Sequence, residues 1–211
     1  MGQKVNPIAF RVGVTKSWDS SWFSGFADYK DSLLVDLKIR KYFDKLKREF
    51  LISNVQIKKF FNKLIVTVET AKPGIFIKSA GGGIANITAD LKKLITADIR
   101  INVKEVKSFY HSADIIASHI ATQIKNRASH VKVIKKAIDD ARKHGVLGIK
   151  IQISGRISGA EIARMEVFSE GSMPLSTIRN NIDYALAEPV TVYGVIGIKV
   201  WVFTKNTKAV N

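Results

Sequence analysis

Apolar residues in the first half of the chain recur first with the period of a helix and then with the period of a strand. In segment 31–50 they return every three or four residues, which marks one helical face; these residues are Ile39, Phe43, Leu46 and Phe50. Asp31 or Ser32 is suited to cap the start of this helix. Segments 54–60 and 63–70 instead alternate around Phe61-Asn62, which predicts a β-hairpin.

The chain next predicts two helices separated by a loop of small residues. Pro73 suits a first helical turn, so a short helix is expected from there until Ser79-Ala80-Gly81 ends it. A second helix is expected over 83–96, with its inward face formed by Ile84, Ile87, Leu91, Leu94 and Ile95. The alternating segment 99–107 predicts a strand.

Helix, strand, strand, helix, loop, helix and strand is the order of a K-homology (KH) domain in its bacterial, type II arrangement. KH domains clamp about four nucleotides of single-stranded RNA with a GXXG loop between the two short helices. The order therefore predicts an RNA-binding domain over 31–108.

The second half predicts a further α+β domain over 109–206, followed by a short tail at 207–211. Segments 112–128 and 130–143 have helical periodicity, and Val131, Ile134, Ile138 and Ala141 mark the buried face of the second. Gly145 suits the residue after its end. Alternating segments from Val146 onward predict a mixed or antiparallel sheet against these two helices.

Residues 1–30 have little periodicity and predict an N-terminal arm. The arm is rich in aromatic residues: Phe10, Trp18, Trp22, Phe23 and Phe26. Two interpretations are open, since these rings can pack back on the body of the protein or stack on bases.

Charge narrows the class of partner. Lys and Arg number 34 against 18 acidic residues, giving a net charge of +16 and a pI near 10.0. Up to Lys107 the chain has 20 basic and 10 acidic residues, and beyond it 14 and 8, so the excess is spread over both halves. We expect a polyanionic partner, nucleic acid first and an anionic membrane second.

Several classes of site are excluded or unsupported. The absence of cysteine excludes disulfides, thiolate zinc sites and cysteine nucleophiles, and four scattered histidines suggest no metal site. No apolar run approaches the roughly 18 residues of a membrane span, and the N-terminus lacks the apolar core of a signal peptide. We expect no cofactor, no small-molecule substrate and no membrane partner, with a cytoplasmic location; an organelle interior stays open.

Short motifs in the second half make the prediction specific. In order they are SGR (154–156), GAEIAR (159–164), EG (170–171), PL (174–175), IDYA (182–185) and YGVIGIKVW (193–201). Together with GQKVNP (2–7), the tryptophans at 18 and 22, and TAKPGI (70–75), they resemble the S-three family of small-subunit ribosomal proteins. The resemblance covers essentially the whole chain and is closest to bacterial and organelle-type members.

This resemblance implies a structural role in the head of the small ribosomal subunit. Its members bind small-subunit ribosomal RNA, line the mRNA entry channel and assist unwinding of structured mRNA there. It also implies the tenth and fourteenth small-subunit proteins as neighbours. Charge and element order on their own indicate only a basic, KH-containing RNA-binding protein.

The resemblance assigns RNA contacts in the KH loop, with one departure. The family has IGKKG where this chain has Ile77 to Gly81, so Lys78 replaces the first glycine. The implied loop residues are Lys72, Lys78, Ser79, Ala80, Gly81 and Gly82. A working clamp and a purely structural turn both stay open. A second G-x-x-G, Gly194 to Gly197, lies in a strand pattern, and we interpret its glycines as permitting close strand packing.

The resemblance also assigns contacts in the second half. The helix at 130–143 would face mRNA, although Val131 stands where the family often has Arg. The implied mRNA contacts are Arg127, just before this helix, and Lys132, Lys135 and Lys136 within it. Contacts to ribosomal RNA are expected from Lys4, Arg11, Arg156, Arg164 and Arg179. Ser169 and Ser172 stand where relatives commonly have Arg, so two phosphate contacts are missing.

Enzymatic alternatives have little support. Glu161, Glu166 and Glu170 are the strongest carboxylate set, but Arg164 beside them indicates ion pairing. No P-loop, zinc-protease or G-x-S-x-G motif occurs. We therefore expect no enzyme and no catalytic residue. Two other hypotheses stay open: a free-standing KH regulator of RNA, and a nucleic-acid lyase with a lysine nucleophile.

Overall fold

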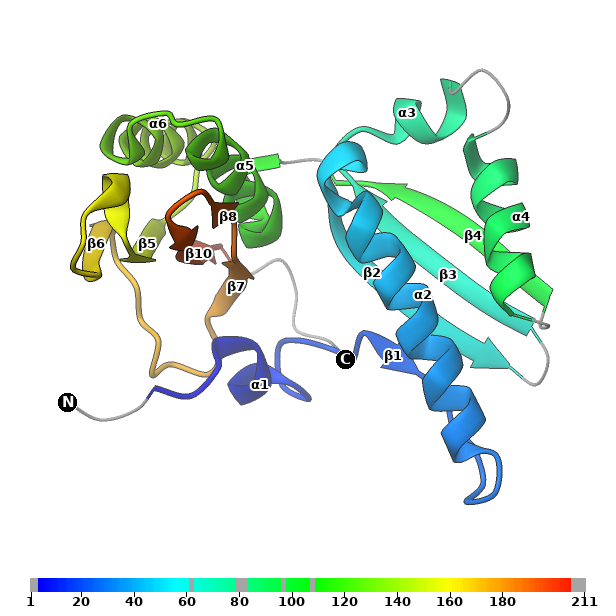
Figure 1. Ribbon diagram of the computed structural model, residues 1–211. Helices are drawn as coiled ribbons and strands as arrows, with labels where there is room; N and C mark the ends of the chain where they lie inside the picture. Colours follow the sequence, from blue (N-terminus) through cyan, green and yellow to red (C-terminus); the bar gives the residue numbers. More distant parts are fainter. Residues whose placement is uncertain (1–3, 61–62, 79–82, 96–97, 107–108, 206–211) are drawn as a thin grey trace. The chain divides into compact units, whose positions relative to one another are not determined.

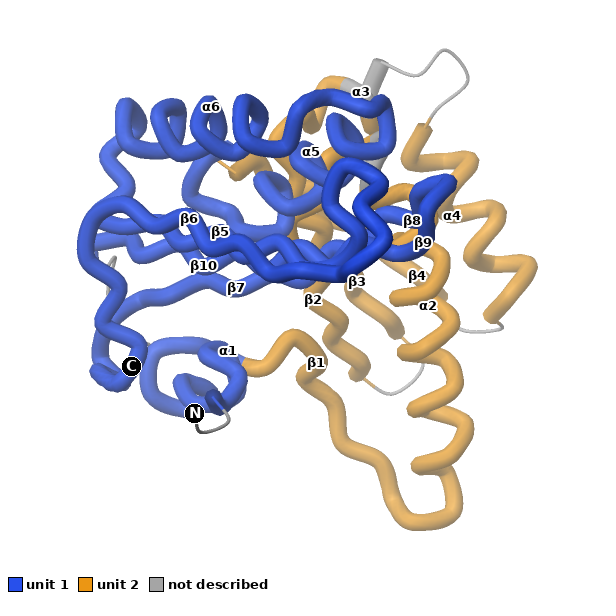
Figure 2. The backbone as a smooth tube through the Cα atoms, turned by 60° about the vertical axis from the view of Figure 1, so that its left-hand side comes forward, with its two compact units in different colours: residues 1–17, 108–211 blue, residues 18–107 orange. Residues whose placement is uncertain are grey.

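The computed structural model describes residues 4–60, 63–78, 83–95, 98–106 and 109–205 of the 211-residue chain (Figure 1). The chain forms two compact units, which Figure 2 colours separately. One, here called the central unit, is Trp18–Lys107; the other, here called the split unit, joins Met1–Ser17 to Ser108–Asn211. The expected N-terminal arm is therefore divided between the two units.

The central unit is a four-stranded sheet with helices on one face (Figure 1). Its elements are β1 (Ser20–Ser21), α2 (Tyr29–Phe50), β2 (Ile52–Phe60), β3 (Lys63–Thr70), α3 (Pro73–Lys78), α4 (Gly83–Leu94) and β4 (Asp98–Glu105). The strand order is β1-β2-β3-β4; β2 and β3 are antiparallel, whereas β4 runs parallel to β3. This is the predicted order of helices and strands.

The core of the central unit uses the predicted periodicities. Ile39 and Phe43 of α2 and Ile87 and Leu91 of α4 pack on alternate residues of β3, and all are buried. The prediction that Leu94 faces inward is wrong, because its side chain is 49% exposed. Helix α4 ends at Leu94, and the next residue, Ile95, fills the buried position instead.

The boundaries of α2 differ slightly from the prediction. The helix begins at Tyr29, so Asp31 and Ser32 lie within its first turn, and the cap residue Asp28 makes no side-chain capping hydrogen bond. At the other end the buried Thr70 hydroxyl donates to the Phe50 carbonyl at 2.6 Å and accepts from the Lys72 backbone N–H at 3.2 Å. Thr70 therefore holds the end of α2 against the start of α3.

The split unit is an antiparallel sheet with two helices on one face. Its helices are α1 (Pro7–Arg11), α5 (Ala113–Lys125) and α6 (His130–Lys143), with 3-10 turns η1 (Phe109–His111) and η2 (Ile157–Gly159). Its strands are β5 (Gly148–Gly155), β6 (Arg164–Gly171), β7 (Asn181–Ala187), β8 (Val190–Thr191), β9 (Gly194–Val195) and β10 (Gly197–Thr204). The main sheet has the order β6-β5-β10-β7, and β8 pairs with β9.

Strand alternation separates the two faces of this sheet. Ile151 and Ile153 of β5 and Val200 of β10 are buried in the core with α5 and α6. Lys150 and Gln152 of β5 point to the opposite face, since successive side chains of a strand alternate. The α+β prediction is thus confirmed for both units.

Glycines permit close contacts at two places in the sheet. Gly148 and Gly171 are register partners, and a Cβ atom on Gly148 would lie 1.8 Å from the Ser172 carbonyl oxygen. Gly197 opposes Ser154 across β5 and β10, as the strand interpretation of the second G-x-x-G predicts. Gly194 instead has φ +121° in the β8–β9 hairpin, a backbone conformation that favours glycine. Gly145, with φ +82°, follows the α6 cap as predicted.

Candidate RNA interface

Helix α6 presents a face of lysines on the side away from the core. Ile134, Ile138 and Ala141 are buried against the sheet, whereas Val131 is only partly buried. Lys132, Lys135 and Lys136 are exposed. Within the described ranges, none of these three lysines forms an ion pair, although Asp139 and Asp140 lie on the same helix. The structure therefore brings the predicted α6 lysines together with their charges uncompensated.

Arg127 lies in the turn that joins α5 to α6. Its side chain is exposed, and its backbone has φ +62°, a left-handed conformation that is uncommon for a residue with a Cβ atom. Its N–H donates to the Ile124 carbonyl at 2.9 Å, which closes the end of α5. Arg127 therefore lies shortly before His130, the first residue of α6, in the sequence.

The start of α6 is held to strand β6 by a chain of polar contacts. His130 Nε2 lies 2.9 Å from Glu166 Oε2, and Arg164 Nε lies 3.2 Å from Glu166 Oε1. Ser158 Oγ lies 3.4 Å from His130 Nδ1. Glu170 of the same strand pairs with Arg142 near the other end of α6. Both ends of the basic helix are thus tied to β6 through side chains.

These contacts also account for the carboxylates considered as catalytic. Glu166 and Glu170 form ion pairs with cations of α6 and β6, as the ion-pair interpretation expected. Glu161 is exposed. In the part of the chain that the structure describes, no group of three His, Asp or Glu side chains is placed to hold a metal ion.

The KH loop itself falls mostly outside the described residues. Lys72 is exposed just before α3, and α4 begins at the buried Gly83. Lys78 is the last residue of α3, so its backbone is helical. The predicted contacts at Ser79, Ala80, Gly81 and Gly82 lie outside the described residues. Thr70, the first residue of the TAKPGI segment, positions the described residues before this loop through its hydrogen bonds with Phe50 and Lys72.

Arg11 has a different role from the one expected. Its side chain is fully buried, and the guanidinium donates to the carbonyls of Pro7, Leu175, Thr177 and Asn180 at 2.7–3.0 Å. A guanidinium with its donors used in this way has no accessible face for a phosphate. Arg11 is therefore a structural residue that fastens α1 to the segment between β6 and β7, and this corrects the prediction of an RNA contact.

The other predicted arginines are exposed but differ in their contacts. Arg156 Nε donates to the Ala160 carbonyl at 2.9 Å, and the guanidinium lies over the Tyr193 ring. Arg164 retains 57% side-chain exposure beside Glu166. Arg179 is exposed in the segment that follows β6. All three remain accessible to a polyanion.

A second basic surface was missed by sequence reasoning. Lys150 and Lys199 lie on the sheet face opposite the helices, and Lys150 packs over the Trp201 ring at 5.4 Å. The exposed Lys4 comes close to this face. Burial, and then the neighbouring Lys4 ammonium, lower the pKa of Lys150 below the ordinary value of a lysine. The sequence did contain a signal for this surface, because lysines alternate with buried residues in β5 and β10.

No helix in the described part of the chain is long and apolar enough to cross a bilayer.

Comparisons with known proteins agree with this architecture. Residues 38–109 match the family described as KH domain, and residues 120–202 match the family described as Ribosomal protein S3, C-terminal domain. The protein named small ribosomal subunit protein uS3 from Shouchella clausii is 42% identical over 96% of this chain and 92% of the relative. Proteins of the same name from Staphylococcus epidermidis and Staphylococcus aureus are 44% identical over 98% of both chains.

The matches settle the type of protein. The relatives carry the name of a small ribosomal subunit protein. Identity of this size over nearly the full length of both partners confirms the resemblance inferred from the short motifs. The chain belongs to the uS3 family of small ribosomal subunit proteins.

Proposed function

We propose that this chain is a structural component of the small-subunit head, where it binds ribosomal RNA and lines the mRNA entry channel. The names of its relatives support the ribosomal part of this proposal. The bacterial source of these relatives supports a bacterial-type ribosome. The tenth and fourteenth small-subunit proteins are its proposed neighbours.

The observation that carries the proposal is the uncompensated lysine face of α6. Lys132, Lys135 and Lys136 are carried by a helix that is anchored at both ends, so the backbone that bears them is ordered before RNA binds. Binding of phosphates then costs side-chain freedom but no ordering of this backbone. Since phosphate contacts carry no sequence information, this surface suits an mRNA of any sequence.

The remaining predicted cations divide between two further contacts. Lys72 and Lys78 flank the KH loop and are proposed to hold single-stranded RNA together with residues 79–82. Lys4, Arg156, Arg164 and Arg179 are proposed to contact ribosomal RNA, with Lys150 and Lys199 added to this set. Two cations close together, such as Lys4 and Lys150, are both stabilised when a phosphate lies between them.

The first test is sedimentation of a cell lysate through a sucrose gradient, with the protein followed by antibody. We expect the protein to migrate with small subunits and whole ribosomes and to leave them only at high salt. Migration as a free protein would contradict the ribosomal role and favour the free-standing KH regulator.

The mRNA contact is tested on small subunits that carry Lys132→Ala and Lys135→Ala. Two mRNAs are compared, one that extends through the entry channel and one that ends before it. We expect faster dissociation of the long mRNA only, because the short one does not reach α6. Lys143→Ala is the matched control, since Lys143 lies on the same helix but pairs with Asp140 at 3.7 Å. Equal dissociation rates for mutant and wild-type subunits would remove α6 from the mRNA path.

A further inference from the structure

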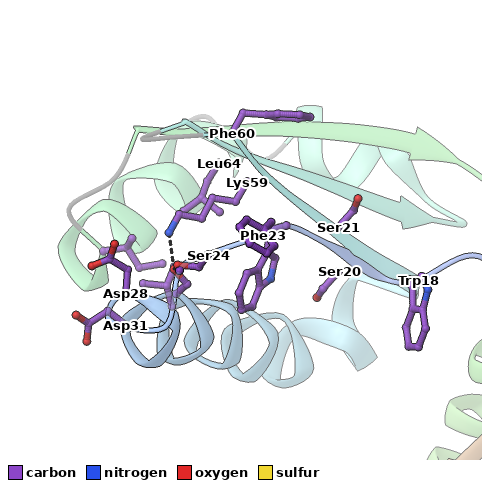
Figure 3. A pocket seen from close by; sticks show the side chains of 15 residues that line it. Trp18, Ser20, Ser21, Phe23, Ser24, Asp28, Asp31, Lys59, Phe60 and Leu64 are labelled. Atoms are coloured by element: carbon purple, nitrogen blue, oxygen red, sulfur yellow. Dashed lines mark hydrogen bonds between the residues drawn. The ribbon is translucent and has the colours of Figure 1, made fainter.

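One end of the central unit carries a groove that none of the RNA contacts uses. It lies between the segment before α2, the first turns of α2 and the end of β2, and has a volume of about 1140 Å³ (Figure 3). Its walls include Trp18, Phe23, Asp28, Asp31, Lys59 and Phe60. A groove of this size has room for the side chains of a polypeptide segment.

Large aromatic rings stand exposed along this groove. Phe23 is 93% exposed, Trp18 73% and Phe60 59%, and the neighbouring Phe26 is fully exposed. The prediction from sequence allowed these rings to pack on the body or to stack on bases. Of the arm's rings in this unit, Trp22 does pack inward, on Tyr29 with ring centroids 5.6 Å apart. The others form an exposed apolar surface of the kind that marks an interaction site.

The backbone beneath these rings is fixed in place by hydrogen bonds. The Ser20 hydroxyl donates to Asp36 at 2.9 Å and accepts from Arg40 at 2.6 Å. The Ile57 N–H donates to the Asp19 carbonyl at 2.9 Å, which joins the segment to β2. The rings are therefore presented by an ordered support, which lowers the entropic cost of binding.

The charge of this region is opposite to that of the whole protein. Residues 18–36 contain four aspartates and a single lysine, within a chain of net charge +16. Asp28 and Asp31 lie on the wall of the groove and form no ion pair within the described residues (Figure 3). Lys59, the one cation on the described wall, donates to the Ser32 hydroxyl at 2.6 Å. The aspartates outnumber the lysines in this segment, and the resulting negative charge disfavours a nucleic-acid backbone.

We propose that this groove binds a basic segment of a neighbouring protein. Apolar side chains of that segment pack on Phe23, Phe26 and Phe60, and its lysines or arginines pair with Asp28 and Asp31. The inference rests on the proposed ribosomal role in one respect, since that role is the reason to look for the partner in the small subunit. It assigns one surface of the central unit to protein and leaves RNA to the basic surfaces.

The experiment places a photo-crosslinker beside the groove in living cells. In the full chain, Phe26→p-benzoylphenylalanine is expressed, the cells are irradiated, and small subunits are purified and digested. We expect the adduct to be a peptide of another protein with a net positive charge. The same crosslinker at Asn86, an exposed position near the start of α4 that does not line the groove, is the control and should not give that peptide.

Four outcomes would overturn the proposal: an adduct on ribosomal RNA, an adduct on a neutral or acidic peptide, an adduct on a second copy of this chain, or no adduct. Sedimentation through the sucrose gradient distinguishes failure of the groove assignment from failure of the proposed ribosomal function. If the chain migrates with small subunits but crosslinks to RNA, only the groove assignment fails. If it never enters small subunits, the ribosomal role fails first.

A second set of variants tests the chemistry of recognition. Asp28→Asn with Asp31→Asn keeps the shape of the wall and removes its charge, and we expect at least a fivefold loss of crosslinking to the basic peptide. Asp44→Asn changes an exposed carboxylate farther along α2 and should have no effect. Phe23→Ser should lower the yield as well. An undiminished yield in the aspartate variant would refute the charge pairing.

Discussion

Arg11 and the lysines of α6 were predicted as one class of residue, cations that contact RNA, yet their surroundings are opposite. Arg11 is fully buried and donates to four backbone carbonyls. Lys132, Lys135 and Lys136 are exposed and form no ion pair within the described ranges. A basic residue in a basic protein is thus no evidence of an RNA contact until its neighbours are known.

The largest effect that this comparison predicts is the loss of Arg11. In Arg11→Ala four carbonyls lose a charged donor, and we expect the split unit to lose about 3 kcal/mol of stability or more. Hydrogen exchange of β7 and β10 measures this loss for the split unit alone, which matters because two units need not unfold together.

Arg11→Lys sharpens the same prediction. It keeps the charge but replaces a planar group with five N–H donors by one ammonium, which cannot reach four carbonyls. We expect most of the destabilisation to remain. Wild-type protection in the lysine variant would show that charge alone, and not the donor geometry, holds α1 in place.

The next effect concerns RNA affinity rather than stability. In the purified chain, Lys132→Ala with Lys135→Ala removes two phosphate contacts, so the slope of log affinity against log salt should fall by roughly 1.5. Affinity for a single-stranded RNA 12-mer should drop about tenfold near 150 mM salt, by fluorescence anisotropy. Protection of the α6 core should stay unchanged, since both side chains are exposed. An unaltered salt slope would place these lysines in the same non-binding class as Arg11.

A smaller effect is expected from the residue that anchors the basic helix. Glu166→Gln removes the charge that pairs with His130 and Arg164, and should weaken the first turn of α6 by about 1 kcal/mol. Hydrogen exchange of that turn reports the change. Glu161→Gln, an exposed carboxylate that no contact ties to α6, is the control. Identical exchange in both variants would mean that α6 is held by its apolar face alone.

The smallest effect is expected from a paired, exposed lysine. Lys143 is 74% exposed and pairs with Asp140 at 3.7 Å, so Lys143→Ala should change stability by no more than about 0.5 kcal/mol. Its effect on RNA affinity should stay below about twofold, because a carboxylate already offsets its charge. A larger loss would show that pairing does not distinguish structural from RNA-binding cations.

Local patterns predicted most of the fold, and distant contacts account for the failures. The period of Ile39 and Phe43, or of the residues in β5, is set by the secondary structure itself, so the order of elements followed from the sequence. Arg11 could not be placed, because its acceptors at Leu175 and Thr177 lie 164 and 166 residues away. Lys150 was overlooked because only the buried face of its strand was considered.

The candidate site was predicted in part. The α6 lysines emerged from periodicity, since Ile134 and Ile138 fix which face is buried and which remains exposed. The groove at Phe23 and Asp28 was beyond such reasoning, because residues 18–28 have no period that reveals their support. Their exposure depends on contacts with β2 and α2 that only the folded structure brings together.

The split unit imposes an order on folding during synthesis. Arg11 is synthesised 169 residues before its acceptor at Asn180. At roughly 5–20 residues per second, this delay is roughly 10 to 30 s. During that interval the nascent N-terminal segment lacks its contact with Asn180. The whole of the central unit, residues 18–107, is synthesised before that contact can form. A chain released before residue 175 would therefore carry a complete central unit and a positively charged N-terminal segment that lacks all three distant acceptors of Arg11.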